Sequence, residues 1–470
     1  MKVEQIYTGC LAQGAYYIES QGEVAIIDPL REVGPYLEKA RKNKAQIKYI
    51  FETHFHADFV SGHLTLSKEA HAPIIYGPNA NPDFETIIAE DGQVFPLGEG
   101  SIVAIHTPGH TMESTTYLLK DKKGKDLAIF SGDTLFLGDV GRPDLAQKAS
   151  HMTQDQLAGL LFDSLRNKII PLSDEVIVYP AHGAGSACGK NMMKETVDTL
   201  GNQKKVNYAL RENMTREEFI KEVTDGLAPP PQYFPLNVKM NQSGYDDFDD
   251  VLSRGLNPLT PESFELLANE SGALILDVRH QDEFVKGHVP QSVFVGLDGG
   301  FAPWVGTLIG DVNQSLLIIA PEGREEETIT RLSRVGFDRA LGYLEGGFEA
   351  WRKSGKEYDM ISGVTATDLE KLVKEEKVAV FDVRKENEFV SEHITSAQNT
   401  PLDFLNDHLD QFPENRPFYI HCAGGYRSVI AASILKKRGI HNLINIEGGF
   451  KAIQETKIKL SDFVCPSTLK

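Results

Sequence analysis

Histidine and aspartate side chains at strand ends in the first half of the chain offer ligands for a metal ion. The run FETHFHADF follows a short apolar stretch and carries His54, His56 and Asp58. Further along, His110 closes a TPGH turn and Asp133 closes an FSGD run. Two imidazoles and a carboxylate, from His54, His110 and Asp133, make a facial set that leaves coordination positions free. Such a set is associated with non-haem Fe(II) and O2 chemistry, although the ligand types alone do not exclude zinc.

A second kind of chemistry is predicted in the run FYIHCAGGYRS at 418–428. A β-type run leads to Cys422, and Arg427 opens the apolar helical pattern that follows. Gly424 and Gly425 let successive backbone N–H groups turn inward as a cradle for an anion. The start of the helix adds positive potential at the same place. Both effects favour the thiolate, which is the nucleophilic form, and would stabilise a persulfide anion on this cysteine.

Short strands and helices must position the first set of ligands. The apolar patterns predict strands that each end near a His or Asp, as a metal pocket requires. The strands are expected at 15–19, 24–28, 47–50, 72–77, 101–110, 115–120, 127–133 and 175–183, with helices at 34–44 and over 190–224. The last helix should start with a capping box at Thr215 and Glu218. The acidic, Gly- and Asn-containing segment 241–258 is interpreted as a linker.

The second half of the chain contains an internal repeat. LILDVRHQDEFVKGHV is echoed by VAVFDVRKENEFVSEHI about a hundred residues later, and LEGGF is echoed by IEGGF. The pattern predicts two tandem α/β domains, each of about 100 residues. In the first copy Pro321 stands where the cysteine should be, and the loop before Arg324 is two residues shorter. Without a thiol, this copy should be catalytically inactive.

Size, charge and cysteine usage limit the remaining possibilities. A chain of 470 residues suggests roughly three domains. The net charge of −19 excludes nucleic acid and anionic membrane surfaces as partners. No run approaches the roughly 20 apolar residues of a membrane span, and no secretion signal opens the chain. The four scattered cysteines indicate a reducing, cytoplasmic location. We also expect a homo-oligomer.

The motifs THFHAD, PGHT, SGD and PAHG, in this order, resemble those of the metallo-β-lactamase fold, an αβ/βα sandwich, over residues 1–245. The GRPD run at 141–144 is similar to the persulfide dioxygenase family within that fold. This resemblance implies one Fe(II) per chain, held by the three ligands named first. His56, Asp58 and His182 would then lie around the metal without binding it. Arg142 would hold the anionic end of a thiol persulfide.

Phe59 separates this resemblance from the hydrolases of the same fold. Glyoxalase-type thioesterases carry H-x-H-x-D-H, and Phe59 replaces the last histidine, so a two-metal centre loses a ligand. Several alternatives remain open. His56 and His182 are either hydrogen-bonded scaffold or direct participants, and Arg142 either binds substrate or forms a surface salt bridge. Cys188 is either a reactive thiol or, as we favour, a small buried apolar residue.

The spacing from Cys422 to Arg427 is C-x4-R, whereas protein tyrosine phosphatases need C-x5-R to surround a phosphate. With DVR and EGGF around it, the loop is similar to that of rhodanese sulfurtransferases, over residues 360–470. The resemblance implies that Cys422 and Arg427 are catalytic. The substrate-binding loop would consist of Ala423, Gly424, Gly425 and Tyr426. The copy at 257–356 would be an inactive rhodanese-like domain.

Together the resemblances imply a fused persulfide dioxygenase and sulfurtransferase: an αβ/βα sandwich followed by two rhodanese-like α/β domains. The expected reaction oxidises a thiol persulfide, of glutathione, coenzyme A or a similar thiol, with O2 to sulfite. Transfer of sulfane sulfur to sulfite would give thiosulfate, in sulfide detoxification. The main alternative is a zinc thioester hydrolase with regulatory rhodanese domains, and a non-enzymatic persulfide sensor or scaffold is a third.

Overall fold

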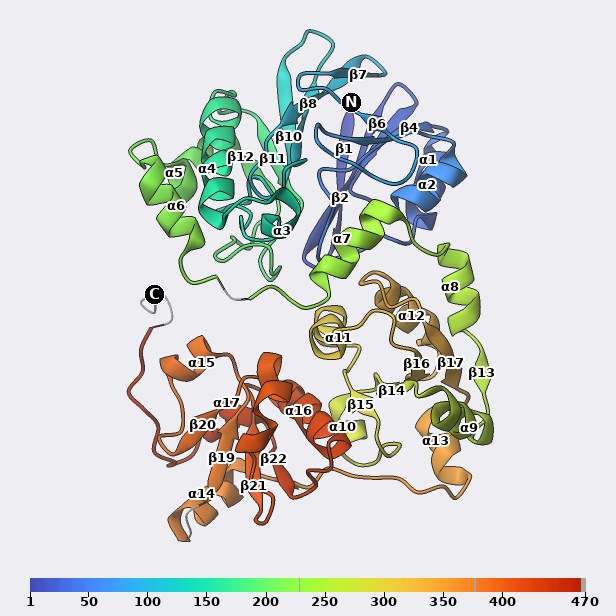
Figure 1. Ribbon diagram of the computed structural model, residues 1–470, viewed down its shortest axis with the longest axis vertical. Coiled ribbons are helices and arrows are strands. Elements are labelled where there is room, and N and C mark those ends of the chain that lie inside the picture. The colour runs from blue at the N-terminus through green and yellow to red at the C-terminus, as the bar shows by residue number, and fades with distance from the viewer. Residues whose placement is uncertain (228, 376–377, 466–470) are drawn as a thin grey trace. The chain divides into compact units, whose positions relative to one another are not determined.

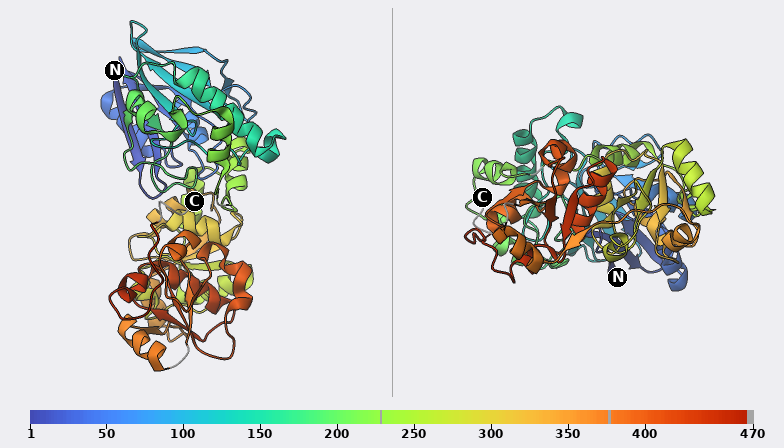
Figure 2. Two further views of the ribbon diagram at one scale, coloured as in Figure 1. Left: turned by 90° about the vertical axis from the view of Figure 1, so that its left-hand side faces the viewer. Right: turned by 90° about the horizontal axis from the view of Figure 1, so that it is seen from below.

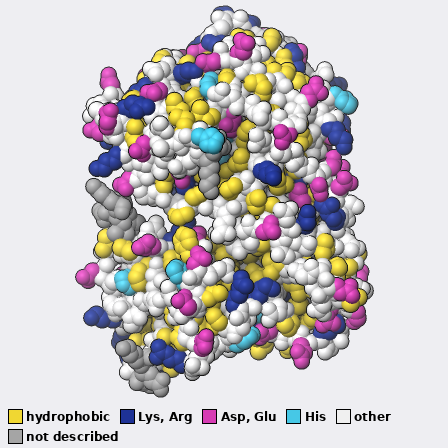
Figure 3. Space-filling model, in the orientation of Figure 1, with side chains coloured by type: hydrophobic (Ala, Val, Ile, Leu, Met, Phe, Trp, Pro, Cys, Tyr) yellow, Lys and Arg dark blue, Asp and Glu magenta, His cyan; other side chains and the backbone are white. Residues whose placement is uncertain are grey.

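The computed structural model describes residues 1–227, 229–375 and 378–465. The chain forms two compact units, one of residues 1–248 with 333–336, the other of residues 249–332 and 337–470 (Figure 1). On the face shown in Figure 3, acidic and basic side chains lie interspersed. Within the described ranges, no helix combines the length and apolar character that crossing a membrane requires.

The first unit contains two six-stranded sheets, in the orders β1-β2-β3-β4-β5-β6 and β12-β11-β10-β9-β8-β7. Their strands are β1 (Lys2–Thr8), β2 (Gln13–Ser20), β3 (Glu23–Ile27), β4 (Gln46–Phe51), β5 (Ile74–Tyr76), β6 (Ile87–Ile88), β7 (Val94–Leu97), β8 (Gly100–His106), β9 (Thr115–Lys120), β10 (Asp126–Gly132), β11 (Ile177–Pro180) and β12 (Asp198–Thr199). The helices of this unit are α1 (Gly34–Asn43), α2 (His63–Ala70), α3 (Gln147–Ser150), α4 (Gln154–Ser164), the π-helix η1 (Leu165–Ile169), α5 (Leu200–Val206), the 3-10 helix η2 (Tyr208–Leu210), α6 (Arg216–Thr224) and α7 (Phe234–Ser243).

The two sheets of the first unit pack face to face, with helices on their outer sides (Figures 1 and 2). Aromatic residues fill the layer between the sheets, among them Tyr16 from β2, Tyr117 from β9 and Phe130 from β10. One outer core lies under α1 and α2 and another under α4, α5 and α6. This arrangement is the predicted αβ/βα sandwich. It forms because strands such as β2, β3 and β9 carry buried residues on both faces, as sheets covered on both sides require.

Two of the element predictions were wrong. Helices do not fill 190–224: the stretch before α5 holds only β12, and η2 and a turn separate α5 from α6. The predicted capping box of α6 is confirmed, with both hydrogen bonds between Thr215 and Glu218 present. The expected linker 241–258 contains the end of α7 and all of α8 (Phe248–Gly255). Phe248 and Val251 are buried, so α8 has an apolar face that the acidic composition concealed.

The second unit contains two five-stranded parallel sheets, in the orders β13-β17-β16-β14-β15 and β18-β22-β21-β19-β20. Their strands are β13 (Pro258–Leu259), β14 (Leu274–Asp277), β15 (Val293–Phe294), β16 (Leu316–Ile319), β17 (Ala340–Leu344), β18 (Gly363–Val364), β19 (Ala379–Asp382), β20 (Ala397–Asn399), β21 (Phe418–His421) and β22 (Leu443–Ile446). The helices are α9 (Pro261–Ser271), α10 (Gln281–Phe284), α11 (Phe301–Ile309), α12 (Glu325–Ser333), α13 (Gly347–Lys353), α14 (Ala366–Glu375), α15 (Glu386–Ser391), the 3-10 helix η3 (Leu402–Gln411), α16 (Tyr426–Lys437) and α17 (Gly449–Ile453). Both sheets place their successive strands in the same spatial order, so the sequence repeat is also a repeat of topology.

The repeated DVR motif forms the same buried ion pair in both copies. Asp277 accepts hydrogen bonds from the Arg279 guanidinium at 2.6 to 3.1 Å, and Arg279 also donates to the Gly287 carbonyl. Asp382 and Arg384 repeat this arrangement at 2.6 to 3.0 Å. Both aspartates end a strand and are fully buried. The motif therefore stabilises the scaffold of each domain.

The strand register corrects the predicted position of the missing cysteine. In the first copy Asp277 pairs with Ile319, and in the second Asp382 pairs with His421. Ala320 follows Ile319 in the first copy, and Cys422 follows His421 in the second. Ala320, and not Pro321, therefore occupies the cysteine position, and the loop is one residue shorter, not two. The copy still lacks a thiol there.

We predict that Asp277→Ala lowers the free energy of unfolding of the middle domain by about 3 to 5 kcal/mol, because it leaves Arg279 buried and unpaired. Both tryptophans of the chain, Trp304 and Trp351, lie in this domain. Urea unfolding followed by tryptophan fluorescence should therefore show the shift directly. Asp382→Ala, the matched change in the other copy, should move this transition much less. An unchanged midpoint in Asp277→Ala contradicts the prediction.

Candidate functional site

Five strands of the first unit end at one edge of the sandwich and supply the polar side chains of the candidate metal centre. His54 follows β4, His110 follows β8 and Asp133 follows β10. Ligand atoms of these three residues lie within 4.8 Å of one another, and all three side chains are buried. The distances to the Oδ2 atom of Asp133 are 3.4 Å from His110 Nε2 and 3.9 Å from His54 Nε2. The structure thus brings the predicted triad together.

Hydrogen bonds at Nδ1 orient both imidazoles of the triad. The Thr53 hydroxyl donates to Asp28 at 2.9 Å, so it can accept from His54 Nδ1, also at 2.9 Å. The Arg142 carbonyl can only accept, and it lies 2.8 Å from His110 Nδ1. Both rings therefore carry hydrogen on Nδ1, and the Nε2 atom of each is directed toward Asp133. Burial, and then the neighbouring His56 and His110, hold the pKa of His54 well below its ordinary value.

The donor set fits a metal ion. Neither carboxylate oxygen of Asp133 has a hydrogen-bond partner among the residues that the structure describes, although the group is buried. A buried carboxylate without donors is costly, and a metal cation held between it and the two imidazoles would compensate for it. Neutral imidazole and ionised carboxylate are the forms that bind a divalent metal.

A second buried group lies beside the triad and contains the three residues predicted to surround the metal. His56, Asp58 and His182 have ligand atoms within 4.8 Å of one another. His182 Nε2 lies 3.5 Å from Asp58 and 3.6 Å from Asp133. Burial lowers the pKa of His182, but Asp58 and Asp133 outweigh it and raise that pKa well above its ordinary value.

Cys188 lies at the same place. Its sulfur is within 4.8 Å of ligand atoms of Asp133 and His182. Burial, followed by the charges of Asp58 and Asp133, raises the pKa of Cys188 to about 12. The thiol thus remains protonated at neutral pH, which agrees with the interpretation of this cysteine as a small buried residue.

Two buried carboxylates behind His56 were not predicted from the sequence. Asp28 follows β3 and lies 3.1 Å from His56 Nε2, while Glu52 lies 3.6 Å from the same atom. Asp28 also accepts from the Thr53 N–H at 2.8 Å, and its φ of 50° is in the left-handed region. Non-glycine residues in this region concentrate at functional sites. Asp28 could have been identified from the sequence by the signal used for the triad, which is a carboxylate directly after a buried strand.

Asn241 on α7 is a second residue that sequence reasoning missed, since it lies in the segment interpreted as a linker. Its Nδ2 donates to the carbonyls of His56 and Phe59, both at 2.8 Å, and its Oδ1 accepts from the Ser61 N–H at 2.9 Å. One buried side chain therefore holds the backbone of the loop that carries the histidines. No local sequence signal could have identified it, because the contact joins positions about 180 residues apart.

Phe59 is fully buried, and its ring lies 4.3 Å from the ring of His56. The ring therefore packs against the His56 imidazole, and it offers no coordinating atom. Arg142 is engaged by Asp144, with two hydrogen bonds of 2.6 Å. Its role in holding a persulfide stays a prediction, and that role requires this pair to open. What the structure shows is that the Arg142 backbone orients His110.

The Cys422 loop connects β21 to α16 in the second unit. The Gly425 N–H donates to Cys422 Sγ at 3.1 Å, and Gly425 has a φ of 104°, which favours glycine. A Cβ atom added to Gly424 or Gly425 would meet no atom within 4 Å, so the loop borders open space there. The loop from Ala423 to Tyr426 thus has the room and the inward N–H group that a bound anion needs.

The EGGF motif supports this loop from behind. The N–H of Phe450 donates to the Cys422 carbonyl at 2.7 Å. Gly449 has a φ of 60°, and a Cβ there would lie 2.5 Å from the same carbonyl oxygen. The positive φ and the lack of room for a Cβ atom explain why the motif needs glycine at this position.

Arg427 pairs with Glu388 through hydrogen bonds of 2.6 and 2.8 Å. Sequence reasoning also missed Glu388.

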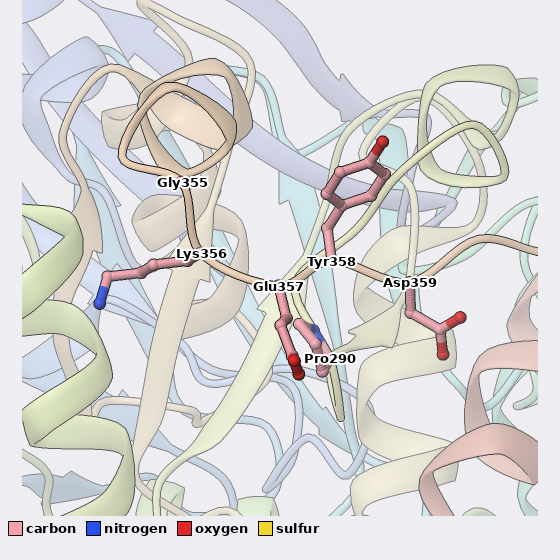
Figure 4. A pocket seen from close by; sticks show the side chains of 6 residues that line it. All are labelled: Pro290, Gly355, Lys356, Glu357, Tyr358 and Asp359. Atoms are coloured by element: carbon pink, nitrogen blue, oxygen red, sulfur yellow. The ribbon is translucent and has the colours of Figure 1, made fainter.

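A surface hollow of about 580 Å³ lies in the second unit, in the loop after α13 (Figure 4). Pro290 and residues 355–359 line it. In the close view the Lys356, Glu357 and Asp359 side chains point in different directions. None of the predicted site residues lines this hollow, so the candidate chemistry does not depend on it.

We predict that Asn241→Ala lowers the free energy of unfolding of the first unit by about 2 to 3 kcal/mol, because it leaves buried backbone groups without partners. It should also lower the metal content after reconstitution, since the histidine loop loses its support. Asn237→Ala is the matched control: Asn237 is also fully buried on α7, but its amide has no hydrogen-bond partner in the described parts of the chain. Equal effects of the two changes on metal content would contradict the prediction.

Comparisons with known proteins agree with this geometry. The metallo-β-lactamase superfamily model matches residues 8–182, and the rhodanese-like domain model matches residues 260–354 and 365–456. A cytoplasmic hydroxyacylglutathione hydrolase of Arabidopsis thaliana is 31% identical over 138 residues, 28% of this chain and 53% of that protein. The human mitochondrial persulfide dioxygenase ETHE1 is 27% identical over 223 residues, 47% of this chain and 78% of that protein. The chain spans 53 to 60% of the length of the first curated relatives it matches.

A solved metallo-β-lactamase structure from Staphylococcus aureus is similar over a longer stretch. The match covers 73% of this chain and 98% of that one, with a TM-score of 0.66 and 28% sequence identity. The predicted fold class is therefore confirmed. The chain joins a metallo-β-lactamase superfamily domain, with homology to the persulfide dioxygenase ETHE1, to two tandem rhodanese-like domains.

Proposed function

We propose that this protein oxidises low-molecular-weight thiol persulfides at a single ferrous ion and transfers sulfane sulfur through Cys422 to the sulfite produced. The observation that carries the proposal is the set of His54, His110 and Asp133, two imidazoles and one carboxylate that are all buried and have ligand atoms within 4.8 Å of one another. Phe59 beside His56 disfavours a second metal. The rhodanese-like loop around Cys422 supports the second half of the reaction.

His54 and His110, through Nε2, and Asp133, through its carboxylate, would hold the iron. When bound, Fe(II) would supply a redox-active centre at which O2 can react with the sulfur chain, while the net electrons come from the terminal sulfur. The Thr53 hydroxyl and the Arg142 carbonyl bind Nδ1 of the two imidazoles and so direct both Nε2 atoms toward the position of the metal. Overall, RSSH, O2 and water give RSH, sulfite and two protons, so the terminal sulfur is oxidised and O2 is reduced.

The second half-reaction uses the thiolate of Cys422. It attacks the terminal sulfur of another persulfide, the S–S bond of the donor breaks, and the thiol RSH leaves. The resulting cysteine persulfide anion would be stabilised by the Gly425 N–H, which already donates to the sulfur. Sulfite then attacks the outer sulfur, which releases thiosulfate and regenerates the thiolate. No net oxidation accompanies this transfer.

The substrates, the location and the assembly are part of the same proposal. The thiol is of low molecular weight, such as glutathione or coenzyme A, and neither nucleic acid nor membrane is a partner. We place the reaction in the cytoplasm, in a homo-oligomer, as part of sulfide detoxification.

A zinc-dependent thioester hydrolase is the second candidate. It is favoured by the 31% identity to the Arabidopsis hydroxyacylglutathione hydrolase, which exceeds the 27% identity to the human persulfide dioxygenase. It is disfavoured by Phe59, which removes a ligand of the second metal. In that case the rhodanese-like domains would be regulatory.

One test of the proposed function concerns metal content and O2 consumption. Protein loaded with iron under anaerobic conditions should bind one iron per chain and consume O2 when glutathione persulfide or coenzyme A persulfide is added, with sulfite and thiosulfate as products. The zinc-loaded protein should consume none, because zinc has no redox chemistry. Two bound zinc ions together with cleavage of a glutathione thioester would instead establish the hydrolase.

Another test separates the metal centre from the Cys422 centre. Cys422→Ser should lower the rate of thiosulfate formation by about 10⁴-fold or more, because loss of a nucleophile costs that much in other enzymes. Its O2 consumption should remain, so that sulfite accumulates. His110→Ala should show the opposite behaviour, losing O2 consumption but still converting added sulfite and persulfide to thiosulfate.

Assays of the products by chromatography, with both variants compared at equal folded concentration, test this separation. Loss of both activities in each single variant would refute two independent centres. A double variant without turnover that still protects cells from sulfide would favour a sensor or scaffold.

A further inference from the structure

The Cys422 loop is tied to the domain that lacks the thiol, within the second unit. Tyr426 belongs to the loop and opens α16, and its hydroxyl donates to the Gly296 carbonyl of the middle domain at 2.7 Å. Its ring lies 5.9 Å from the ring of Phe294, in an edge-to-face arrangement. A Cβ atom added to Gly299 would come within 2.3 Å of the ring carbon Cζ. The Tyr426 ring thus packs against the segment after β15, where Gly296 and Gly299 leave room for it.

This contact extends along one face of α16. Ser433 is seven residues after Tyr426, so both lie on the same side of the helix. The Ser433 hydroxyl accepts a hydrogen bond from the Phe294 N–H at 2.9 Å. Phe294 ends β15, which is an edge strand of the middle sheet. The helix therefore covers this edge and uses a backbone donor that an edge strand would otherwise leave exposed.

Three consecutive loop residues make three different anchoring bonds. Gly425 donates its N–H to Cys422 Sγ, and Arg427 pairs with Glu388 in the same domain. Tyr426, between them, is held by the other domain. The peptide that carries the Gly425 N–H is separated from Tyr426 only by the two backbone rotations at Gly425. The direction of this N–H therefore depends on where Tyr426 is held. Burial raises the pKa of Tyr426, so its hydroxyl keeps the proton that it donates.

We propose that the middle rhodanese-like domain is a structural part of the sulfur-transfer site: Gly296 and Gly299 seat Tyr426, and Tyr426 is a positioning residue that keeps the Gly425 N–H directed at Cys422. The domain without a cysteine is therefore needed for the reactivity of the domain that has one. The inference rests on the proposed sulfur-transfer function for its meaning, but the geometry of the loop can be tested without turnover.

The test is Gly299→Ala in the full-length protein. The added methyl group would displace the Tyr426 ring from its seat, since the two would overlap. Gly300→Ala is the matched control, because a Cβ there would meet only Trp304, at 3.3 Å and beyond. Neither glycine has a positive φ. The pH dependence of Cys422 alkylation by iodoacetamide, followed by peptide mass spectrometry, reports how well the loop stabilises the thiolate.

Gly299→Ala should raise the midpoint of this pH profile by about half a pH unit or more, because a hydrogen bond to the ionised sulfur is weakened. It should also reduce kcat for thiosulfate formation by roughly tenfold or more, as displacement of catalytic groups by about 1 Å does elsewhere. Gly300→Ala should match the unaltered protein in both. A folded Gly299→Ala protein with an unchanged midpoint overturns the inference.

Tyr426→Phe provides the second variant if Gly299→Ala does not fold. It keeps the ring and removes only the hydroxyl, so it should shift the midpoint in the same direction by a smaller amount, and an unchanged midpoint overturns the inference. If the unaltered protein forms no thiosulfate, the proposed function fails. In that case the pH profile of Cys422 alkylation still tests whether Tyr426 positions the loop. Failure of the proposed function can therefore be distinguished from failure of this inference.

Discussion

The buried carboxylate of Asp133 is the group around which the first unit is arranged. It has no hydrogen-bond donor among the described residues, and isolated charges are expensive to bury. Two imidazoles direct their Nε2 atoms toward it, and each is oriented at Nδ1 by an acceptor. A cation is the simplest group that satisfies all three side chains together. The fold therefore buries a set of side chains that a bound metal cation would stabilise.

The support of that site reaches far along the chain. Asp28 follows one strand, Thr53 follows the next, and their hydrogen bonds connect the loop of His54 to the neighbouring strand end. Asn241 holds the same loop from a helix near the end of the unit. Phe59 packs against His56 and gives that imidazole an apolar neighbour in place of a second metal ligand. These contacts connect the proposed one-metal chemistry to the packing around the loop.

The two rhodanese-like domains show what a repeat preserves and what it changes. Both keep the buried Asp–Arg pair and the same strand order, because these features stabilise the scaffold. Only the second copy keeps the cysteine and its glycines, while the first has Ala320 at that position. The contact of Tyr426 with Gly296 gives the altered copy a role in the site of the other.

The sequence alone was sufficient for the fold class, for the repeat and for the residue types of both chemical centres. These features depend on local patterns: apolar runs that end in His or Asp, and a cysteine followed by glycines and a helix. The linker interpretation of 241–258 and the placement of Pro321 were wrong, because an amphipathic face and a strand register depend on what lies opposite in space. Asn241, Asp28, Glu388 and the seat of Tyr426 likewise required the tertiary structure. Their partners are distant in sequence or belong to another domain, and a hydrogen bond between such positions leaves no periodicity or spacing in the chain.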